Sequence, residues 1–471
     1  MTDAQDLTAH PWFFCGIGGS GMLPLALILH GKGATVAGSD RSRDQGRTPE
    51  KFVWLEQLGF ALHPQDGSGI TSPKQTLVAS AAVEDTVPEV VRAGELGCAR
   101  MSRAQLLAAL FNQAALGIAV GGTSGKSTVT GMIGWILTAT GRDPTIMNGA
   151  VMKNFVSPEA PFASARVGKG AAFVSEVDES DGSIALYRPA VAVLGNVSLD
   201  HKSLEELREL FGDFLARAQV CAINLDDAET RPLAARAGSL VTFGIESTEA
   251  DIGVFPGSIA EAPTALCATL LDRRDDSRHE LALAVPGRHN LANALAALAA
   301  TNAAGVPLAD GVAALASFAG LARRFDVVGT SKAGITVIDD FGHNPDKVSA
   351  TLATLKAHQG RVIALFQPHG YGPLRQMGGE LAQVLAQGLS PDDRVILTDP
   401  VYFGGTVDRT VGSARIVELV NAAGGNAEHV PTREAAADHI AALARPGDRV
   451  VIMGARDDTL SLFARELLAR L

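Results

Sequence analysis

Cysteine, aromatic residues and net positive charge are all scarce in this 471-residue sequence. Its 4 cysteines form no Cys-x-x-Cys pair, which argues against a disulfide scaffold and against a structural zinc site. A net charge of −11 argues against a dedicated nucleic-acid binder, whose surface is normally basic. No uncharged run approaches the roughly 20 apolar residues of a membrane span.

The segment MTDAQDLTAHPW has neither the basic start nor the apolar core of a secretory signal. Together with unpaired cysteines, this predicts a protein of the reducing cytoplasm. Hydrophobic residues are plentiful at 46%, with 19% charged, enough for large buried cores. The length predicts about three domains.

Short apolar runs alternate with helical patterns along the chain, which predicts an α/β fold of parallel sheets with helices on both faces. Residues 258–287 differ and predict a hairpin before a helix at Asn290. Asn344-Pro345 predicts a helix cap and first helical position. Strands are expected in WFFC, TLVASAAV, Ile118–Val120, AAFVSEV, AVAVLGNV, VCAINL, ITVIDDF, RVIALFQP, RVILTDP and RVVIMGA.

A first glycine loop follows the predicted strand WFFC. Gly16, Gly18 and Gly21 fit G-x-G-x-x-G, and Asp40 follows the next predicted strand. Backbone amides at a helix N-terminus suit a pyrophosphate, and a carboxylate suits a ribose. The pattern does not separate a nicotinamide dinucleotide from a UDP-sugar, and a tight turn without a ligand stays open.

A second glycine loop, GGTSGKST at residues 121–128, stands between a predicted strand and an amphipathic helix. It misses the usual G-x-x-x-x-G-K-[ST], because Val120 stands where the first glycine should be. Its small residues still let backbone amides approach phosphate oxygens. Lys126 can meet the β- and γ-phosphates, and Ser127 or Thr128 can give Mg²⁺ a hydroxyl. Several classes of NTPase or kinase fit these residues.

Carboxylates and a histidine follow two further predicted strands. Glu176 ends one strand, where a magnesium-nucleotide site needs an oxygen ligand. In the next loop lie Asp178, Glu179 and Asp181, which could equally be a solvated, capped turn. After another strand come Asn196, Asp200 and His201; we expect His201 to serve a metal or phosphate, with a structural histidine as the alternative.

A third group lies near the start of the last block. Arg323 and Arg324 precede a predicted strand that ends at Asp339 and Asp340, with His343 beyond it. Adjacent arginines are often surface charge. They could instead neutralise a transferring phosphoryl group.

These segments together resemble the Mur ligase family, most closely its alanine-adding branch. The resemblance rests on motifs in family order between residues 14 and 369, namely GIGGSGM, GSD, VASAAVEDTVPEV, GGTSGKST, SEVDESDGS, NVSLDH, GRHNLANALAA, ARRFD, DDFGHNP and FQPH. The family's phosphate loop is the shorter G-T-x-G-K-[ST]-[ST], so the second loop is complete.

The resemblance implies three domains: a Rossmann-like UDP-sugar domain at 1–116, a central P-loop-type ATP domain at 117–324, and a Rossmann-like C-terminal domain at 325–471. It implies an ATP-dependent ligase of peptidoglycan precursor synthesis, with ATP and Mg²⁺. The enzyme would join an amino acid, expected to be L-alanine, to the carboxylate of UDP-N-acetylmuramate through an acyl phosphate. We expect no nucleic-acid or membrane partner, and a monomer or homodimer.

The resemblance also assigns residues. Catalytic roles fall on Lys126, Glu176, His201 and Arg324, with Ser127, Thr128, Glu176 and His201 as metal ligands. The nucleotide would be held by Gly122, Thr123, Ser124, Gly125, Lys126, Ser127, Thr128, Asn290, Asn293, Arg323, Asp340 and His343. The other substrates would meet Gly18, Ser20, Gly21, Asp40, His369 and Arg375.

The sequence departs from the branch in several places. Gly370 replaces an arginine of the motif FQPHR, FGHNP replaces Y-G-H-H-P, and GTSGKST replaces G-T-H-G-K-T-T. Ala216 stands where some Mur ligases carry a carbamylated lysine, an absence that the alanine-adding branch shares. A ligase for another amino acid or a preformed peptide, a non-catalytic homologue and a nicotinamide oxidoreductase remain alternatives.

Overall fold

A computed structural model describes residues 7–80, 83–180, 182–198, 202–401, 409–455 and 457–471. The chain divides into two compact units. Unit 1 comprises residues 1–260, 267–284 and 290–320, and unit 2 comprises 261–266, 285–289 and 321–471. Among the described residues, none of the helices is both long and apolar enough to cross a membrane.

The first sheet of unit 1 is entirely parallel, with strand order β3-β2-β1-β4-β5. Its central strand β1 is wholly buried, which fits the apolar run WFFC. The strands are β1 (Trp12–Cys15), β2 (Val36–Ser39), β3 (Ala61–His63), β4 (Thr76–Ala79) and β5 (Ala99–Ser102). The helices are α1 (Met22–Gly31), α2 (Arg41–Asp44), α3 (Pro49–Gln57), α4 (Pro88–Leu96) and α5 (Arg103–Asn112).

The second sheet of unit 1 carries β6 between β9 and β10, with both pairings parallel. It continues outward as β8-β7-β9-β6-β10-β11-β12-β13-β15, and β16 pairs with β15. The strands are β6 (Leu116–Gly121), β7 (Thr145–Met147), β8 (Ala165–Arg166), β9 (Ala172–Glu176), β10 (Val191–Leu194), β11 (Val220–Asn224), β12 (Leu240–Phe243), β13 (Ile252–Val254), β15 (Ala265–Asp272) and β16 (Ser277–Leu283). The helices are α6 (Lys126–Ala139), α7 (Leu204–Ala216), α8 (Thr230–Leu233), α9 (Arg288–Ala303) and α10 (Leu308–Leu315); β14 (Ala260–Ala262) lies at the unit boundary.

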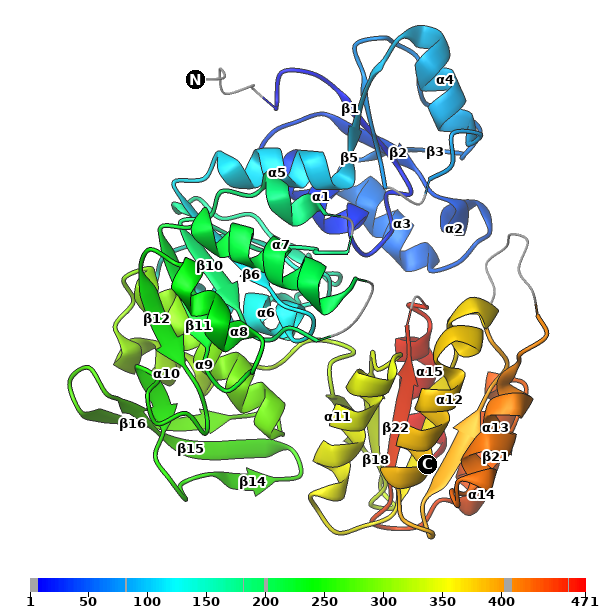
Figure 1. Cartoon of the computed structure of the whole chain (residues 1–471). Helices are drawn as coiled ribbons and strands as arrows, with labels where there is room; N and C mark the ends of the chain where they lie inside the picture. The colour runs from blue at the N-terminus through cyan, green and yellow to red at the C-terminus, as the bar shows by residue number, and fades with distance from the viewer. Residues whose placement is uncertain (1–6, 81–82, 181, 199–201, 402–408, 456) are drawn as a thin grey trace. The chain divides into compact units, whose positions relative to one another are not determined.

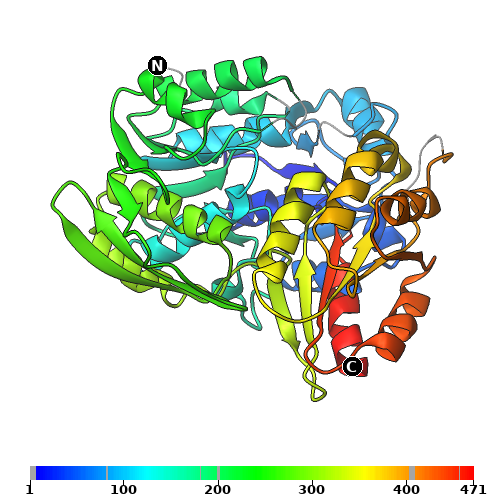
Figure 2. The same cartoon turned by 60° about the horizontal axis from the view of Figure 1, so that its bottom comes forward.

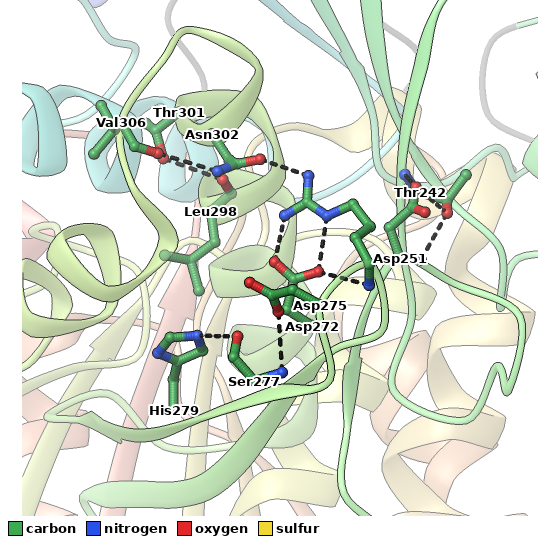
Figure 3. A network of polar contacts seen from close by, with 11 residues as sticks. Thr242, Asp251, Asp272, Asp275, Ser277, His279, Leu298, Thr301, Asn302 and Val306 are labelled. Atoms are coloured by element: carbon green, nitrogen blue, oxygen red, sulfur yellow. Dashed lines mark hydrogen bonds and ion pairs between the residues drawn. The ribbon is translucent and has the colours of Figure 1, made fainter.

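The predicted hairpin before Asn290 is confirmed as β15 and β16, the long green arrows at the left of Figure 2. A polar network joins this hairpin to the end of α9 (Figure 3). Arg274 donates from Nε to Asp272 Oδ1 over 2.8 Å and from Nη1 to Asn302 Oδ1 over 2.7 Å. Asn302 Nδ2 in turn donates to the Val306 carbonyl over 3.1 Å. The network ties the C-terminal end of α9 to the hairpin, and the first turns of the same helix carry Asn290 and Asn293.

Unit 2 is a sheet of order β17-β18-β22-β19-β20-β21 with helices on both faces. Along β19, Ala364 and Phe366 pack on one face and Ile363 and Leu365 on the other, the period of two expected of a strand buried on both sides. Helices α11 and α12 cover the first face, in front of β18 and β22 in Figure 1. The elements are β17 (Asp326–Thr330), β18 (Thr336–Asp340), α11 (Pro345–Lys356), β19 (Val362–Gln367), α12 (Tyr371–Gln387), β20 (Arg394–Leu397), α13 (Ser413–Ala422), β21 (Ala427–His429), α14 (Arg433–Leu443), β22 (Arg449–Gly454) and α15 (Leu460–Arg470).

The predicted α/β class is confirmed, and so is the cap at α11, where Asn344 Oδ1 accepts from the Lys347 amide over 3.0 Å. The sheets are not parallel throughout, however. The pairs β7–β8, β13–β15 and β17–β18 are antiparallel. Each of these pairs lies toward an edge of its sheet, where a short connection can reverse the chain without a crossover helix.

Candidate nucleotide-binding site

The second glycine loop joins β6 to α6, the strand-to-helix context that phosphate binding requires. Gly122 has φ 125° and Gly125 has φ 84°, both in the left-handed region that favours glycine. A Cβ on Gly125 would lie only 2.4 Å from Asn293 Oδ1. Asn293 therefore lies directly against this loop, and its amide nitrogen also donates to Asn290 Oδ1 over 3.2 Å. The structure brings these predicted residues together.

Residues that follow β10 hold the loop in place. The Ser124 amide donates to Asn196 Oδ1 over 2.8 Å, and Asn196 Nδ2 donates to the Ser124 carbonyl over 3.0 Å. Thr123 Oγ1 accepts from the Ser198 amide over 3.0 Å. Because β10 is a direct neighbour of β6, its carboxyl end supplies these contacts without a long reach.

Lys126, the first residue of α6, points back over the loop. Its Nζ donates to the Gly122 carbonyl over 2.7 Å and to Glu179 Oε2 over 2.9 Å. Glu179 is only 5% exposed, so this ion pair is largely shielded from solvent. The sequence placed Glu179 in an acidic loop without assigning it a role, and the structure makes it the partner of the loop lysine.

Ser127 and Glu176 meet as the sequence predicts for a magnesium-nucleotide site. Ser127 Oγ donates to Glu176 Oε2 over 2.8 Å. Glu176 ends β9, the other direct neighbour of β6. A Cβ on Gly149 would lie 2.4 Å from Glu176 Oε1, so glycine there leaves room for the carboxylate. Thr128 lies mostly buried in the first turn of α6.

The donor set fits Mg²⁺ in its chemistry, since a hydroxyl and a carboxylate are the hard oxygen ligands this ion prefers. Among the described residues, no three His, Cys, Asp or Glu side chains form a group that could hold a metal. A Mg²⁺ ion at Ser127 and Glu176 would need further ligands, and phosphate oxygens and water are ones that this ion commonly takes. Asp181, Asp200 and His201 lie outside the described residues, and the role of His201 stays a prediction.

Asp178 is a turn cap in the structure, the simpler of the two interpretations of the acidic loop. Its Oδ1 accepts from the Ser180 amide over 2.9 Å and from Ser180 Oγ over 2.7 Å. Burial raises the pKa of Asp178, but the Ser180 hydrogen bonds and the charges of Lys126 and Arg103 together hold it below its ordinary value. Asp178 is therefore an anion, and with Glu179 it places two negative charges near Lys126.

The first glycine loop is closed by Asp40. One carboxylate oxygen accepts from the Gly18 amide over 2.8 Å and the other from the Ser42 amide over 2.8 Å, which caps α2. The buried Lys51 donates to the Gly18 carbonyl over 3.2 Å. Ser20 is exposed, and Gly21 precedes α1. The structure thus brings Gly18 and Asp40 into contact, and their contact with a UDP-sugar stays a prediction.

In unit 2 the predicted nucleotide contacts face inward. Asp340 Oδ1 accepts from the Gly342 amide over 2.7 Å and from Thr351 Oγ1 over 3.0 Å, and Oδ2 accepts from the Phe325 amide over 2.8 Å. Arg323 is 8% exposed. Burial raises the pKa of its ion-pair neighbour Asp339, and Arg323 partly offsets that rise. A ribose role for Asp340 stays a prediction, and these contacts show what its carboxylate does within unit 2.

His343 and His369 lie together at a small apolar pocket, with their ring centroids 5.2 Å apart. Burial is the main cause, and the charge of the nearby Lys347 a further one, of the fall in the pKa of His343 to about 3, so the ring is neutral near pH 7. The lining includes Pro345, Phe366, Pro368, Pro373, Leu374 and Met377. Arg375, exposed on α12, is not one of the lining residues. The predicted pair of His369 and Arg375 is therefore not gathered at this pocket.

Comparison with known proteins relates this architecture to one family. Residues 13–115 match the Mur ligase family, catalytic domain; residues 120–301 match the Mur ligase middle domain; residues 323–456 match the Mur ligase, glutamate ligase domain. A UDP-N-acetylmuramate–L-alanine ligase from Streptomyces coelicolor is 36% identical over 95% of this chain and 95% of its own length. The corresponding Agrobacterium fabrum ligase is 35% identical over 95% and 94%.

Solved structures agree with this relationship. The UDP-N-acetylmuramate-alanine ligase of Thermotoga maritima matches with a TM-score of 0.80 and 26% identity, covering 98% of this chain and 99% of that one. A murein peptide ligase from Psychrobacter arcticus has the same fold, with a TM-score of 0.71, 23% identity and 98% coverage of both chains.

Proposed function

This chain belongs to the Mur ligase family, and on that premise we propose that it joins L-alanine to the carboxylate of UDP-N-acetylmuramate at the expense of ATP. The observation that carries the proposal is the arrangement around the second glycine loop. Lys126 and Ser127 follow β6 and Glu176 ends β9, so the three residues stand at the carboxyl ends of two adjacent parallel strands, where a triphosphate and its metal would bind.

The chemistry has two steps. A carboxylate oxygen of the sugar nucleotide attacks the γ-phosphorus of ATP, the bond to the β-phosphate oxygen breaks, and ADP leaves. The amine of alanine then attacks the acyl carbon, phosphate leaves with the acyl oxygen, and the amine gives up a proton. Bound Mg²⁺ would neutralise charge on the transferring phosphoryl group.

The residues of this chain supply positioning and charge. The loop amides and Lys126 would hold the β- and γ-phosphates, which requires Lys126 to exchange Glu179 for phosphate oxygens. The Ser127 hydroxyl and Glu176 carboxylate would hold the metal. Gly18, Gly21 and Asp40 would hold the sugar nucleotide, and Asn290 and Asn293 the adenine side of ATP. The domains at 1–116, 117–324 and 325–471 would divide these tasks.

Gly370 favours a second candidate, a ligase for a different amine. It stands where the branch carries an arginine, and its φ of 136° suits glycine. No guanidinium is available at that position to pair with the carboxylate of an incoming amino acid. We propose L-alanine first because the curated relatives of this chain carry that activity in their names.

The reaction is tested by phosphate release with ATP, Mg²⁺, UDP-N-acetylmuramate and a panel of amino acids and short peptides. We expect release that needs all four components, stops when Mg²⁺ is chelated and is fastest with L-alanine. Faster turnover with another amine would support the second candidate. ADP formation that is indifferent to the sugar nucleotide would contradict both. We place the reaction in the cytoplasm, where ATP is made and where four free cysteines stay reduced.

A further inference from the structure

The ion pair between Lys126 and Glu179 stands on the second glycine loop itself. Lys126 Nζ donates to Glu179 Oε2 over 2.9 Å and to the Gly122 carbonyl over 2.7 Å. An ammonium group has three N–H donors, so these two contacts use two of them. Only 19% of the lysine side chain and 7% of the glutamate side chain are exposed. Water therefore screens this pair less than it screens an ion pair on an open surface.

The place of Glu179 is set by the backbone that follows β9. The Glu179 carbonyl accepts from the Gly182 amide over 3.3 Å, and the Asp178 carbonyl accepts from the Ile184 amide over 3.2 Å. Gly182 has φ 74°, in the left-handed region that favours glycine. The Asp178 side chain is bonded to the Ser180 amide over 2.9 Å. These bonds hold the segment that carries Glu179, and its carboxylate is the one that turns to the lysine.

A carboxylate and a phosphate make the same kind of contact with an ammonium group. Both are anions whose oxygens accept a short, charge-assisted hydrogen bond. Under the proposed function Lys126 meets the β- and γ-phosphates, which takes two of its three donors. One of its two contacts within the protein must then be given up. The Gly122 carbonyl belongs to the loop backbone beside the lysine, so the contact that phosphate replaces is the one with Glu179.

We propose that Glu179 is an internal competitor for Lys126, an anion of the protein that the phosphates of ATP must displace, and that it thereby sets the affinity of the loop for ATP. The proposal rests on the proposed function, which supplies the triphosphate. Glu179 acts through the lysine, so it is a positioning residue. If the pair forms in about nine tenths of the molecules, the apparent affinity is about tenfold weaker than that of the unpaired loop.

Three single variants of the full chain test the proposal: Glu179→Gln, Glu179→Asp and the control Asp178→Asn. The control is matched because Asp178 is the adjacent carboxylate and interacts electrostatically with Lys126, and because asparagine keeps an oxygen for the Ser180 amide. Calorimetric titration with magnesium and a non-hydrolysable ATP analogue gives the affinity. Thermal unfolding gives Tm, and phosphate release gives KM for ATP.

We expect Glu179→Gln to bind the analogue about threefold to tenfold more tightly than the parent, because the lysine loses its competing anion. KM for ATP should fall as well, and Tm should fall slightly because a shielded ion pair is lost. Glu179→Asp keeps the charge on a shorter side chain and should lie between the parent and Glu179→Gln. Asp178→Asn should change the affinity less, because Asp178 bonds Ser180 rather than the lysine.

The sign of the effect separates competition from a structural role. A partner that only ordered the loop would, when lost, lower both Tm and the affinity for the analogue. Equal or weaker binding by a folded Glu179→Gln protein would therefore overturn the proposal. If that variant does not fold, Glu179→Asp decides, and binding no tighter than that of the parent would contradict the proposal.

Two further outcomes separate the proposal from its premises. An equal gain of affinity in Asp178→Asn would overturn it, because the effect would then come from negative charge near the loop and not from the ion pair. A parent protein that binds the analogue but forms no amide with any amine would refute the proposed function. The affinity series would still decide the role of Glu179 in that case.

Discussion

Two glycine loops follow two parallel strands in unit 1, and each is closed by a side chain from the neighbouring strand. The Gly18 amide donates to Asp40, which comes directly after β2, and the Ser124 amide donates to Asn196, which comes after β10. Both hydrogen bonds are 2.8 Å long. The same plan, a glycine turn tied to the next strand end, therefore occurs twice in one unit.

The two side chains that close the loops, Asp40 and Asn196, differ in charge and in the hydrogen bond made by the other polar atom of the side chain. Asp40 is a buried carboxylate that accepts twice, from Gly18 and from Ser42. Asn196 is neutral, accepting from the Ser124 amide and donating to the Ser124 carbonyl. A fixed negative charge under the first loop suits a neutral group such as a ribose hydroxyl. A neutral closure under the second loop leaves its amides and Lys126 to meet phosphates.

The largest expected effect on turnover comes from replacing Lys126, a residue of the second loop that has no counterpart in the first. Replacing it by alanine removes the cation that would meet the β- and γ-phosphates, so turnover should fall by about 10³-fold. Binding of UDP-N-acetylmuramate through the first loop should be unchanged. Phosphate release and a calorimetric titration with the sugar nucleotide measure the two effects.

Lys169→Ala is the control for that substitution, since Lys169 is exposed in the same unit. Loss of sugar-nucleotide binding in Lys126→Ala would break the comparison, because it would mean that the two loops do not act separately. Retained turnover would exclude the second loop as the site of the reacting phosphates.

Much of this arrangement follows from the sequence, because it depends on local pattern and parallel topology. The spacing of Gly125, Lys126 and Ser127 predicts a loop and a helix start, and a carboxylate at the end of the next predicted strand, Glu176, is expected near it. Glu179 could not be chosen in advance over Asp178. Asp178 turns to cap Ser180, and only the folded loop shows that Glu179 faces the lysine.

The arginine pair and the edge strands were beyond sequence reasoning for related reasons. Arg323 and Arg324 are alike as sequence, and they are separated by backbone angles and by partners more than 100 positions away, such as Gly454 and Asp457. Strands β3, ALH, and β17, DVVGT, are short and only partly buried, so they carry no clear hydrophobic period.

An exchange of the two closing side chains tests the comparison directly. Asn196→Asp places an oxygen against the Ser124 carbonyl and a charge beside the phosphates, so ATP affinity should fall by about tenfold or more. Asp40→Asn removes the negative charge that strengthens the hydrogen bonds from the Gly18 and Ser42 amides, and it turns an N–H group toward one of these amides. It should cost about 1–2 kcal/mol of stability and leave ATP affinity unchanged.

Titration calorimetry and denaturant unfolding separate these two outcomes. Asp85→Asn serves as the control, because the side chain of Asp85 is 87% exposed. If the Asn196→Asp protein bound ATP as tightly as the parent, the neutral charge of Asn196 would not be needed for ATP binding. The charges of the two closing side chains would then give no reason to assign different ligands to the two loops.

The smallest effect concerns the residue before the first loop. Cys15 ends β1, whereas Gly121 ends β6 and has no titrating group. Burial raises the pKa of Cys15 to about 11 from 9.0, and the charge of Glu89 adds to the rise. The folded protein therefore keeps the thiol proton that the unfolded chain loses above pH 9. This contribution to stability is complete below pH 9 and lost as pH rises through about 11.

One such thiol gives a slope of about 1.4 kcal/mol per pH unit between these values. Burial also raises the pKa of Cys221 to about 12, so it adds a similar slope. Cys15→Ala should remove about half of the stability that the protein loses at alkaline pH. The free energy of unfolding is measured by denaturant unfolding at pH 8 to about 11, with the fluorescence of buried Trp12 as the signal. Cys267→Ala, at an exposed thiol, should leave the slope unchanged. An unaltered slope in Cys15→Ala would mean that water reaches the end of β1 and that burial does not hold the proton on this thiol.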